Sequence, residues 1–149
     1  LIYRPKEWYD GALPCGNSVA TLILVKLAHL TGKNQWQQWA DNQLQAAASQ
    51  QTSPLGKSFY LVALMQRIYP TQELIAVVDE HDIVPLKQYL SSKFRPQLNV
   101  LIKTTTNSQA LAHLAPFTAD FKRNGYYLCQ NQTCRQPIST LDELSKVLF

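Results

Sequence analysis

The loop from Trp8 to Ser18 gathers side chains that could do chemistry, and it leads directly into a long apolar segment. Its polar groups are the carboxylate of Asp10 and the side chains of Asn17 and Ser18. A carboxylate that faces a cavity can act as a general acid or base. The aromatic pair Trp8–Tyr9 could stack on a sugar ring. The loop is therefore the first candidate for a binding or catalytic surface.

A structural role is the competing interpretation of this loop. Gly11, Pro14 and Gly16 allow turn conformations, and Asp and Asn side chains often satisfy backbone N–H groups in such turns. A glycosidase usually needs two carboxylates, one on each side of the scissile bond. Glu7, just before the aromatic pair, is the weaker second carboxylate. Both interpretations of Asp10 stay open at this point.

Cys129 and Cys134 form a second candidate site, with four residues between them across a turn. As a redox pair they lack the C-x-x-C arrangement that tunes thiols in thioredoxin-like proteins. A zinc site would need two more ligands, and the spacing is not the usual C-x₂-C. The interpretation we favour is a structural pair, reduced or disulfide-bonded, so we expect no metal and no cofactor. The other potential zinc ligands are Cys15, His29, His81 and His113.

Three helices are expected in the first 70 residues to position the loop. Asn17 or Ser18 can cap the first helix, and Gly32 suits its end. That helix is apolar almost all round, so it should be buried on most sides. Ser53, followed by a proline, suits the start of the third helix. The expected ranges are Ser18–Thr31, Asn34–Gln50 and Pro54–Tyr69.

Residues 71–149 alternate strands and helices in the order β-α-β-α-β-α. This order predicts a mostly parallel three-stranded sheet with helices against it. The fold class is thus mixed α and β, with a helical hairpin region over 1–70 and a small α/β subdomain over 71–149. The expected strands are Glu73–Asp79, Leu98–Thr105 and Tyr126–Gln130, and the expected helices are Asp82–Phe94, Gln109–Leu114 and a last one opened by the capping box Thr140–Glu143.

Asp79 ends the first expected strand, where open parallel sheets place their ligands. No glycine-rich phosphate loop comes after it, so nucleotide binding is not expected. We interpret Asp79 as a turn or cap residue.

The composition excludes several classes of protein. The net charge of +4 is spread along the chain without a basic stripe, which argues against nucleic-acid binding. No run approaches the roughly 20 apolar residues of a membrane span. Three cysteines, an odd number, indicate a reducing compartment, and the cytoplasm is the expected location.

Two separated motifs resemble those of one protein family. They are the loop Tyr9–Ala20 (YDGALPCGNSVA) with the helix end Leu30–Gly32 (LTG), and the C-terminal stretch Tyr127–Pro137 (YLCQNQTCRQP). Their order is similar to that in thioredoxin-domain proteins of the spermatogenesis-associated protein 20 type, including YyaL-like bacterial relatives. The chain departs from this pattern at Cys15, where serine is expected. We interpret Cys15 as a neutral replacement rather than a nucleophile.

The resemblance implies that the chain is the C-terminal part of a longer protein, which agrees with a start at Leu1 rather than Met. Such proteins resemble a thioredoxin-like domain followed by an α/α toroid, similar to sugar epimerases and six-hairpin glycosidases. Residues 1–70 would be the closing helices of that toroid. Its partner would be the upstream part of the same polypeptide. The chain alone would not be a complete enzyme.

In this interpretation the loop is one wall of a toroid pocket for a carbohydrate-like ligand. Asp10 is the expected catalytic carboxylate, and the expected ligand contacts are Trp8, Tyr9, Asn17 and Ser18. Two alternatives stay open. One is a non-catalytic interaction module that docks through an apolar helical face. The other is a thiol-redox accessory in which Cys129 and Cys134 serve an upstream thioredoxin-like domain.

Overall fold

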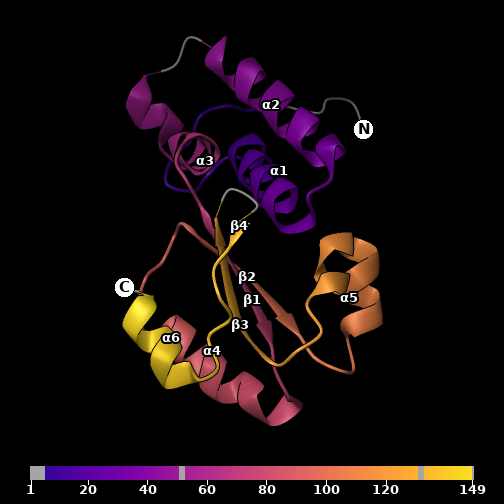
Figure 1. The fold of residues 1–149 in the computed structure, drawn as a ribbon. Helices are drawn as coiled ribbons and strands as arrows, with labels where there is room; N and C mark the ends of the chain where they lie inside the picture. Colours follow the sequence, from indigo (N-terminus) through magenta and orange to yellow (C-terminus); the bar gives the residue numbers. More distant parts are fainter. Residues whose placement is uncertain (1–5, 51–52, 131–132, 149) are drawn as a thin grey trace. The chain divides into compact units, whose positions relative to one another are not determined.

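The computed structural model describes residues 6–50, 53–130 and 133–148. The chain divides into two compact units, Leu1–Tyr69 and Pro70–Phe149. The first is built of helices and the second of a sheet with helices on its faces (Figure 1). The predicted mixed α and β class is confirmed. Within the described ranges, no helix has both the length and the apolar content that crossing a membrane requires.

In its described residues the helical unit has three α-helices, with α1 packed against both of the others. They share a cluster of buried apolar residues that includes one tyrosine, whose hydroxyl donates to the Leu44 carbonyl at 3.1 Å. Arg67 on the third helix also forms a two-bond ion pair with Asp41 on the second. The elements are α1 (Gly16–Thr31), α2 (Asn34–Ala48), the 3₁₀ turn η1 (Pro54–Lys57) and α3 (Ser58–Ile68), and the core residues are Val25, Ala40, Leu44, Ala47 and Tyr60.

Helix α1 begins two residues earlier than its sequence predicts. The N-cap is Cys15, whose Sγ accepts a bond from the Ser18 N–H at 3.5 Å, so the prediction that Asn17 or Ser18 caps the helix is wrong. Serine or threonine usually provides this bond, and here the thiol takes its place. At the other end, Gly32 has φ 65° and donates its N–H to Ala28, which confirms it as the residue that ends α1.

The third predicted helix is divided in two. Ser53 caps the 3₁₀ turn η1 by accepting a bond from the Gly56 N–H. Lys57 then leaves helical geometry, with φ −126°, and α3 starts at Ser58. The Lys57 ammonium group donates to the carbonyls of Ala47 at 2.8 Å and Gln50 at 2.6 Å. These bonds hold the interruption between η1 and α3 against the end of α2. They also satisfy carbonyl acceptors that have no partner within the helix at its C-terminus.

The α/β unit has a four-stranded sheet in the order β2-β1-β3-β4. Only β1 and β2 are parallel, and the other two pairings are antiparallel. The prediction of a three-stranded, mostly parallel sheet is therefore wrong. The elements are β1 (Gln72–Val77), η2 (Glu80–Asp82), α4 (Ile83–Ser91), β2 (Leu98–Lys103), α5 (Ser108–Leu114), η3 (Pro116–Asp120), β3 (Gly125–Gln130), β4 (Thr133–Cys134) and α6 (Leu141–Val147).

The difference arises from the two connections that leave the parallel strands. Helix α4 returns the chain to the starting edge of the sheet, so β2 runs parallel to β1. The segment with α5 and η3 stays at the edge where β2 ends, so β3 must run back along β1. The short strand β4 then pairs with β3, Cys129 opposite Cys134. Alternation of strands and helices in the sequence does not distinguish these two kinds of connection.

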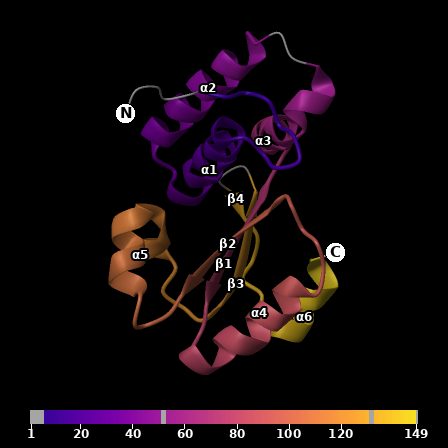
Figure 2. The same cartoon turned by 180° about the vertical axis from the view of Figure 1, so that it is seen from behind.

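Both faces of the sheet are covered. Helices α4 and α6 cover one face (Figure 2). Leu86 of α4 and Leu144 of α6 belong there to one buried cluster with Leu74, Ala76 and Leu128. Phe117 and Phe121, in and after η3, pack on the other face, which carries Ile75 and Val77. Burial on both faces explains why β1 reads as a continuous apolar run.

The buried Lys103, the last residue of β2, ties the second face together. Its ammonium group donates to the carbonyls of Thr118 at 2.7 Å and Phe121 at 2.8 Å. The predicted cap of α6 is also confirmed, because Thr140 accepts from the Glu143 N–H. The return bond differs from a standard capping box, since Glu143 accepts from the Ser139 N–H, one residue before the cap.

Gly125, the first residue of β3, supports a prediction about the sheet. Its φ is +149°, and an added Cβ would lie 3.1 Å from the Ile138 carbonyl oxygen. Gly125→Ala should therefore lower the free energy of unfolding by about 1–3 kcal/mol. Urea unfolding followed by circular dichroism measures the change.

Gly16→Ala is the matched control, because Gly16 lies in the first turn of α1 with nothing within 4 Å of an added Cβ. It should leave stability unchanged or raise it by less than about 1 kcal/mol. Equal effects of the two substitutions would contradict the strain that we assign to Gly125.

Candidate functional site

The carboxylate of Asp10 is the centre of the loop that the sequence singles out. One oxygen, Oδ1, accepts a bond from the Cys15 N–H at 2.9 Å. The other, Oδ2, accepts from the Phe59 N–H at 2.9 Å, the Tyr60 N–H at 3.1 Å and the Ser18 hydroxyl at 3.2 Å. The residue is only 4% exposed. Four donors from two distant parts of the chain thus surround one buried charge.

These donors lie at the beginnings of two helices. Phe59 and Tyr60 are in the first turn of α3, whose N-cap residue Lys57 provides no side-chain cap. Ser18 is in the first turn of α1. Since helix N-termini carry partial positive charge and unpaired N–H groups, a carboxylate there is stabilising. Asp10 therefore acts as a shared cap that joins α1 to α3.

The environment sets the charge of Asp10. Burial by itself raises the pKa of its carboxyl group, but the four bonds donated to it outweigh that effect and hold the pKa below its ordinary value of 3.8. A carboxylate with a lowered pKa is a weak general base at neutral pH, and a buried one does not reach a ligand. The arrangement favours the structural interpretation of Asp10, and the catalytic role stays a prediction.

The predicted ligand contacts lie in different environments. The half-buried Trp8 packs against the helical core, whereas the ring of Tyr9 is 63% exposed, so the two do not form one stacking platform. The side-chain amide of Asn17 donates to the Glu7 carbonyl at 2.6 Å. This bond holds the first residues of the loop against the start of α1. Ser18 is fully buried and bonded to Asp10. The structure brings together Asp10, Ser18 and Cys15, and leaves Tyr9 facing solvent.

A second group of ionisable side chains lies after β1. Asp79, His81 and Asp82 offer ligand atoms within 4.8 Å of one another, and the first two are exposed. The neighbouring Glu80 accepts bonds from the hydroxyls of Thr106 and Thr104, which lower the pKa of its carboxyl group. From the sequence we considered Asp79 as a strand-end residue and His81 as a possible zinc ligand beside the cysteines, but we missed this grouping, although the spacing D-x-H-D is a visible signal. Exposed groups of this kind are common without a bound ion.

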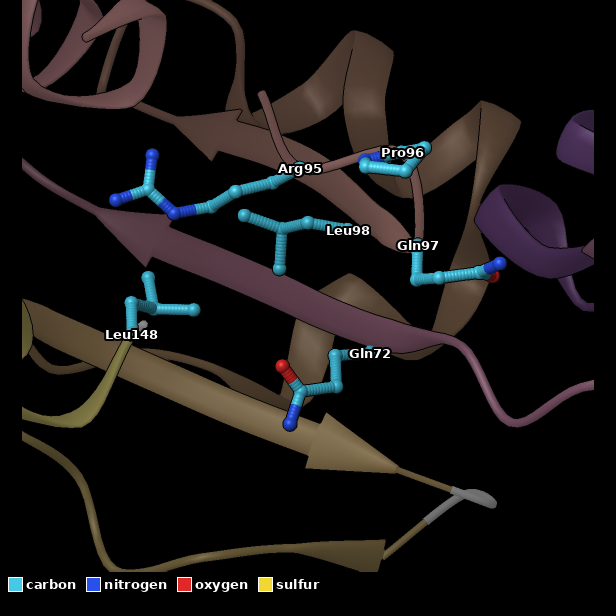
Figure 3. Close-up of a pocket in the computed structure, with 6 residues that line it drawn as sticks. All are labelled: Gln72, Arg95, Pro96, Gln97, Leu98 and Leu148. Atoms are coloured by element: carbon cyan, nitrogen blue, oxygen red, sulfur yellow. The ribbon is translucent and has the colours of Figure 1, made fainter. Parts of the chain in front are cut away.

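A small pocket of about 200 Å³ opens beside the start of β2 (Figure 3). This is below the usual size of a small-molecule site. The side chains of Arg95 and Gln97 run in opposite directions along its rim (Figure 3). The Arg95 guanidinium stacks on Tyr89 and donates to its hydroxyl, which donates to the Leu148 carbonyl. Arg95 thus braces the C-terminal segment, and the lining side chains in the described part of the chain do not converge as a binding site would require.

Cys129 and Cys134 are joined as a disulfide across the β3–β4 pair. Cys129 belongs to the core cluster of Ile75 and Val77 and is 5% exposed, whereas Cys134 is exposed. Cys15 is a buried free cysteine. The bond uses both sulfurs, so this form of the pair has no thiolate for a metal.

Substituting Asp10 tests its role as a shared helix cap. Asp10→Asn puts an amide group against backbone N–H donors, so it should lower the free energy of unfolding by about 2–4 kcal/mol at pH 7. Because the folded-state pKa of Asp10 is lowered, its contribution is present above about pH 4 and is lost as the pH falls through the folded value. The stability gap between wild type and variant should therefore narrow below about pH 4 in urea titrations.

Asp120→Asn is the matched control, since Asp120 is an exposed residue of η3. It should change the stability at pH 7 by less than about 0.5 kcal/mol. A pH-independent gap for Asp10→Asn would contradict the assignment of a buried, ionised cap.

Cys15 provides a separate test of the same junction. A serine hydroxyl accepts a backbone N–H bond better than a thiol, so Cys15→Ser should keep the stability within about 1 kcal/mol of wild type or raise it. Cys15→Ala removes the cap of α1 and should cost about 1 kcal/mol or more. Thermal melts of the two variants measure the difference. If Ser and Ala are equally destabilising, Cys15 does not act as the cap.

The chain has distant relatives among known proteins. No family model matches it, and no solved structure matches it significantly. Curated relatives that match are spermatogenesis-associated protein 20 from human and from rat, both 27% identical over 155 residues, and from mouse, 26% identical. Each alignment covers 99% of this chain and 20% of the relative.

The chain thus spans about a fifth of the length of the curated relatives it matches. The alignments run along almost its whole length, through both the glycine-punctuated loop and the cysteine hairpin that suggested the resemblance. The resemblance to proteins of the spermatogenesis-associated protein 20 type is thus supported by a distant similarity along almost the whole chain.

Proposed function

We propose that the chain is a non-catalytic packing module at the C-terminal end of a longer protein of this family. Its helical unit closes an α/α toroid formed with upstream helices, and its α/β unit comes after that toroid. The observation that carries the proposal is an apolar face of α3 that the helical unit leaves uncovered. The proposed location is the cytoplasm, where the free thiol of Cys15 would persist and the Cys129–Cys134 disulfide would be subject to reduction.

The uncovered face is here named the α3 stripe. Its residues follow the i, i+1, i+4, i+7, i+8 pattern of one helix face. Their exposed fractions range from 39% to 63%, although all are large and apolar. An apolar helix face of this kind usually marks a contact with another protein surface. The stripe consists of Leu61, Val62, Met65, Ile68 and Tyr69.

The occupant we propose for the α3 stripe is the remaining polypeptide of the family protein. The matched relatives are about five times as long as the aligned segment, so they contain enough further chain to supply neighbouring helices. A buried contact between helices of one polypeptide favours uncharged side chains, because burying a charge is costly. None of the residues of the α3 stripe is charged at pH 7, in agreement with such a contact.

A pocket wall formed by the loop Trp8–Ser18 is a second part of the proposal. The loop leaves Tyr9 and Leu13 exposed, at 63% and 81%. These two side chains, rather than the buried Asp10, would meet a carbohydrate-like ligand inside the toroid. The choice of a carbohydrate-like ligand rests on the likeness of fold to sugar epimerases and six-hairpin glycosidases that the family resemblance implies.

The first test is the mass of the native polypeptide that carries this sequence. A mass several times 16.9 kDa is expected. Met65→Lys combined with Ile68→Lys should then lower the melting temperature of that polypeptide by roughly 5 °C or more, because two ammonium groups would be buried in an apolar contact. The same double substitution in the 149-residue chain should change the melting temperature little, since both sites are exposed there.

Phe94→Lys is the control, because Phe94 is 92% exposed and lies outside the α3 stripe. It should be neutral in both polypeptides. A native mass near 16.9 kDa would overturn the proposal. So would self-association of the isolated chain that the lysine pair abolishes, since a second copy would then be the occupant.

A further inference from the structure

The disulfide between Cys129 and Cys134 lies at the open edge of the sheet. Strand β4 is the outermost strand and consists of only two residues, Thr133 and Cys134. In the antiparallel register, Cys129 and Cys134 are directly opposite each other. Among the described residues no further strand pairs with β4, and both of its residues are exposed.

The two sulfurs differ in accessibility. Cys129 is 5% exposed and packs with the core residues Ile75 and Val77. Cys134 and its neighbours Thr133 and Arg135 are exposed. A thiolate must reach a sulfur along the line of the bond that breaks. Attack from solvent is therefore directed at Cys134, with Cys129 as the leaving group.

Two charged residues are neighbours of the pair in the chain or in the sheet. Arg135 comes directly after the exposed Cys134, and Glu73 of β1 is directly opposite the buried Cys129 in the register of β1 and β3. Positive charge beside a cysteine stabilises a thiolate, so Arg135 favours the approach of a thiolate to Cys134 rather than to Cys129.

The fold does not depend on this bond. It joins residues only five apart, so it restricts the unfolded chain little. Backbone bonds hold the same region independently, from Arg135 to Leu128 at 3.0 Å and in both directions between Tyr126 and Ile138, at 2.8 and 2.9 Å. The strands β1 and β3, which form the core pairing, lie on the inner side of the bond. It can therefore open without the loss of the sheet.

We propose that Cys129–Cys134 is a thiol–disulfide exchange site whose substrate is a dithiol reductant. The reductant thiolate bonds to Cys134 Sγ as the bond to Cys129 Sγ breaks, and Cys129 leaves with the electron pair and takes a proton from water. The second thiol of the reductant, as thiolate, attacks its own sulfur in the mixed disulfide and releases Cys134, which is protonated in turn. The reductant becomes a disulfide, and the pair gains two electrons and two protons.

The direction of attack is tested on the oxidised 149-residue chain with Cys15→Ser, which removes the free thiol. Glutathione is the probe, because as a monothiol it has no second thiol of its own to release the mixed disulfide, which is trapped at short reaction times before Cys129 or a second glutathione can resolve it. After acid quenching and peptide mapping, the glutathione is expected on Cys134 and not on Cys129. An adduct on Cys129, or equal amounts on both, would overturn the proposal.

The second measurement is the rate of reduction by dithiothreitol in native buffer and in urea. Reduction of the folded chain should be within about tenfold of the rate in urea, because Cys134 is exposed in the fold. Reduction only after unfolding would identify the bond as purely structural.

A matched pair of variants measures the asymmetry directly. In Cys129→Ser the remaining Cys134 thiol should react with Ellman's reagent at least about tenfold faster than Cys129 does in Cys134→Ser. Both variants are made with Cys15→Ser, and circular dichroism checks that they are folded. Equal rates in two folded variants would contradict the proposal, and the glutathione and dithiothreitol measurements decide it if either variant fails to fold.

Discussion

A single buried carboxylate organises the helical unit. Asp10 accepts N–H bonds from the first turn of α3 and from the residue that caps α1, so one negative charge holds two helix beginnings together. The bonds that it receives also offset the cost of taking the charge out of water. The turn-forming residues around it are explained by this geometry, since the chain must bend sharply to bring Asp10 to both helices. Lys57 makes the complementary connection, from the start of α3 to the end of α2.

The same network explains why a loop rich in polar groups is a poor candidate for catalysis. Asp10 and Ser18 use their polar atoms on each other and on the backbone, and Asn17 uses its amide on Glu7. What the loop offers to solvent is the ring of Tyr9 and the side chain of Leu13. A packing module that shapes, at most, the rim of a neighbouring pocket agrees with this distribution better than an active site does.

The α/β unit depends on a different constraint, the direction in which the chain returns after each strand. Helix α4 makes the one parallel connection, and the α5–η3 segment makes an antiparallel one that Lys103 ties to the end of β2. β3 is thereby placed between β1 and the two-residue strand β4. The edge position of β4 leaves Cys134 open to solvent while Cys129 packs in the core. The chemical asymmetry of the pair is thus a consequence of the strand order.

Local signals in the sequence were sufficient for most of the helices, for three of the four strands and for the family resemblance. Gly32, Ser53 and the Thr140–Glu143 box mark helix ends through bonds within a few residues, and the loop and cysteine motifs are contiguous. Only the tertiary structure decided the rest, because it depends on groups far apart in the chain. The role of Asp10 rests on N–H groups 49 and 50 residues away, and the sheet's direction rests on how loops return. Cys15 is a different case, because its bond from the Ser18 N–H spans only three residues, and the sequence missed this cap because serine or threonine, not cysteine, usually provides it.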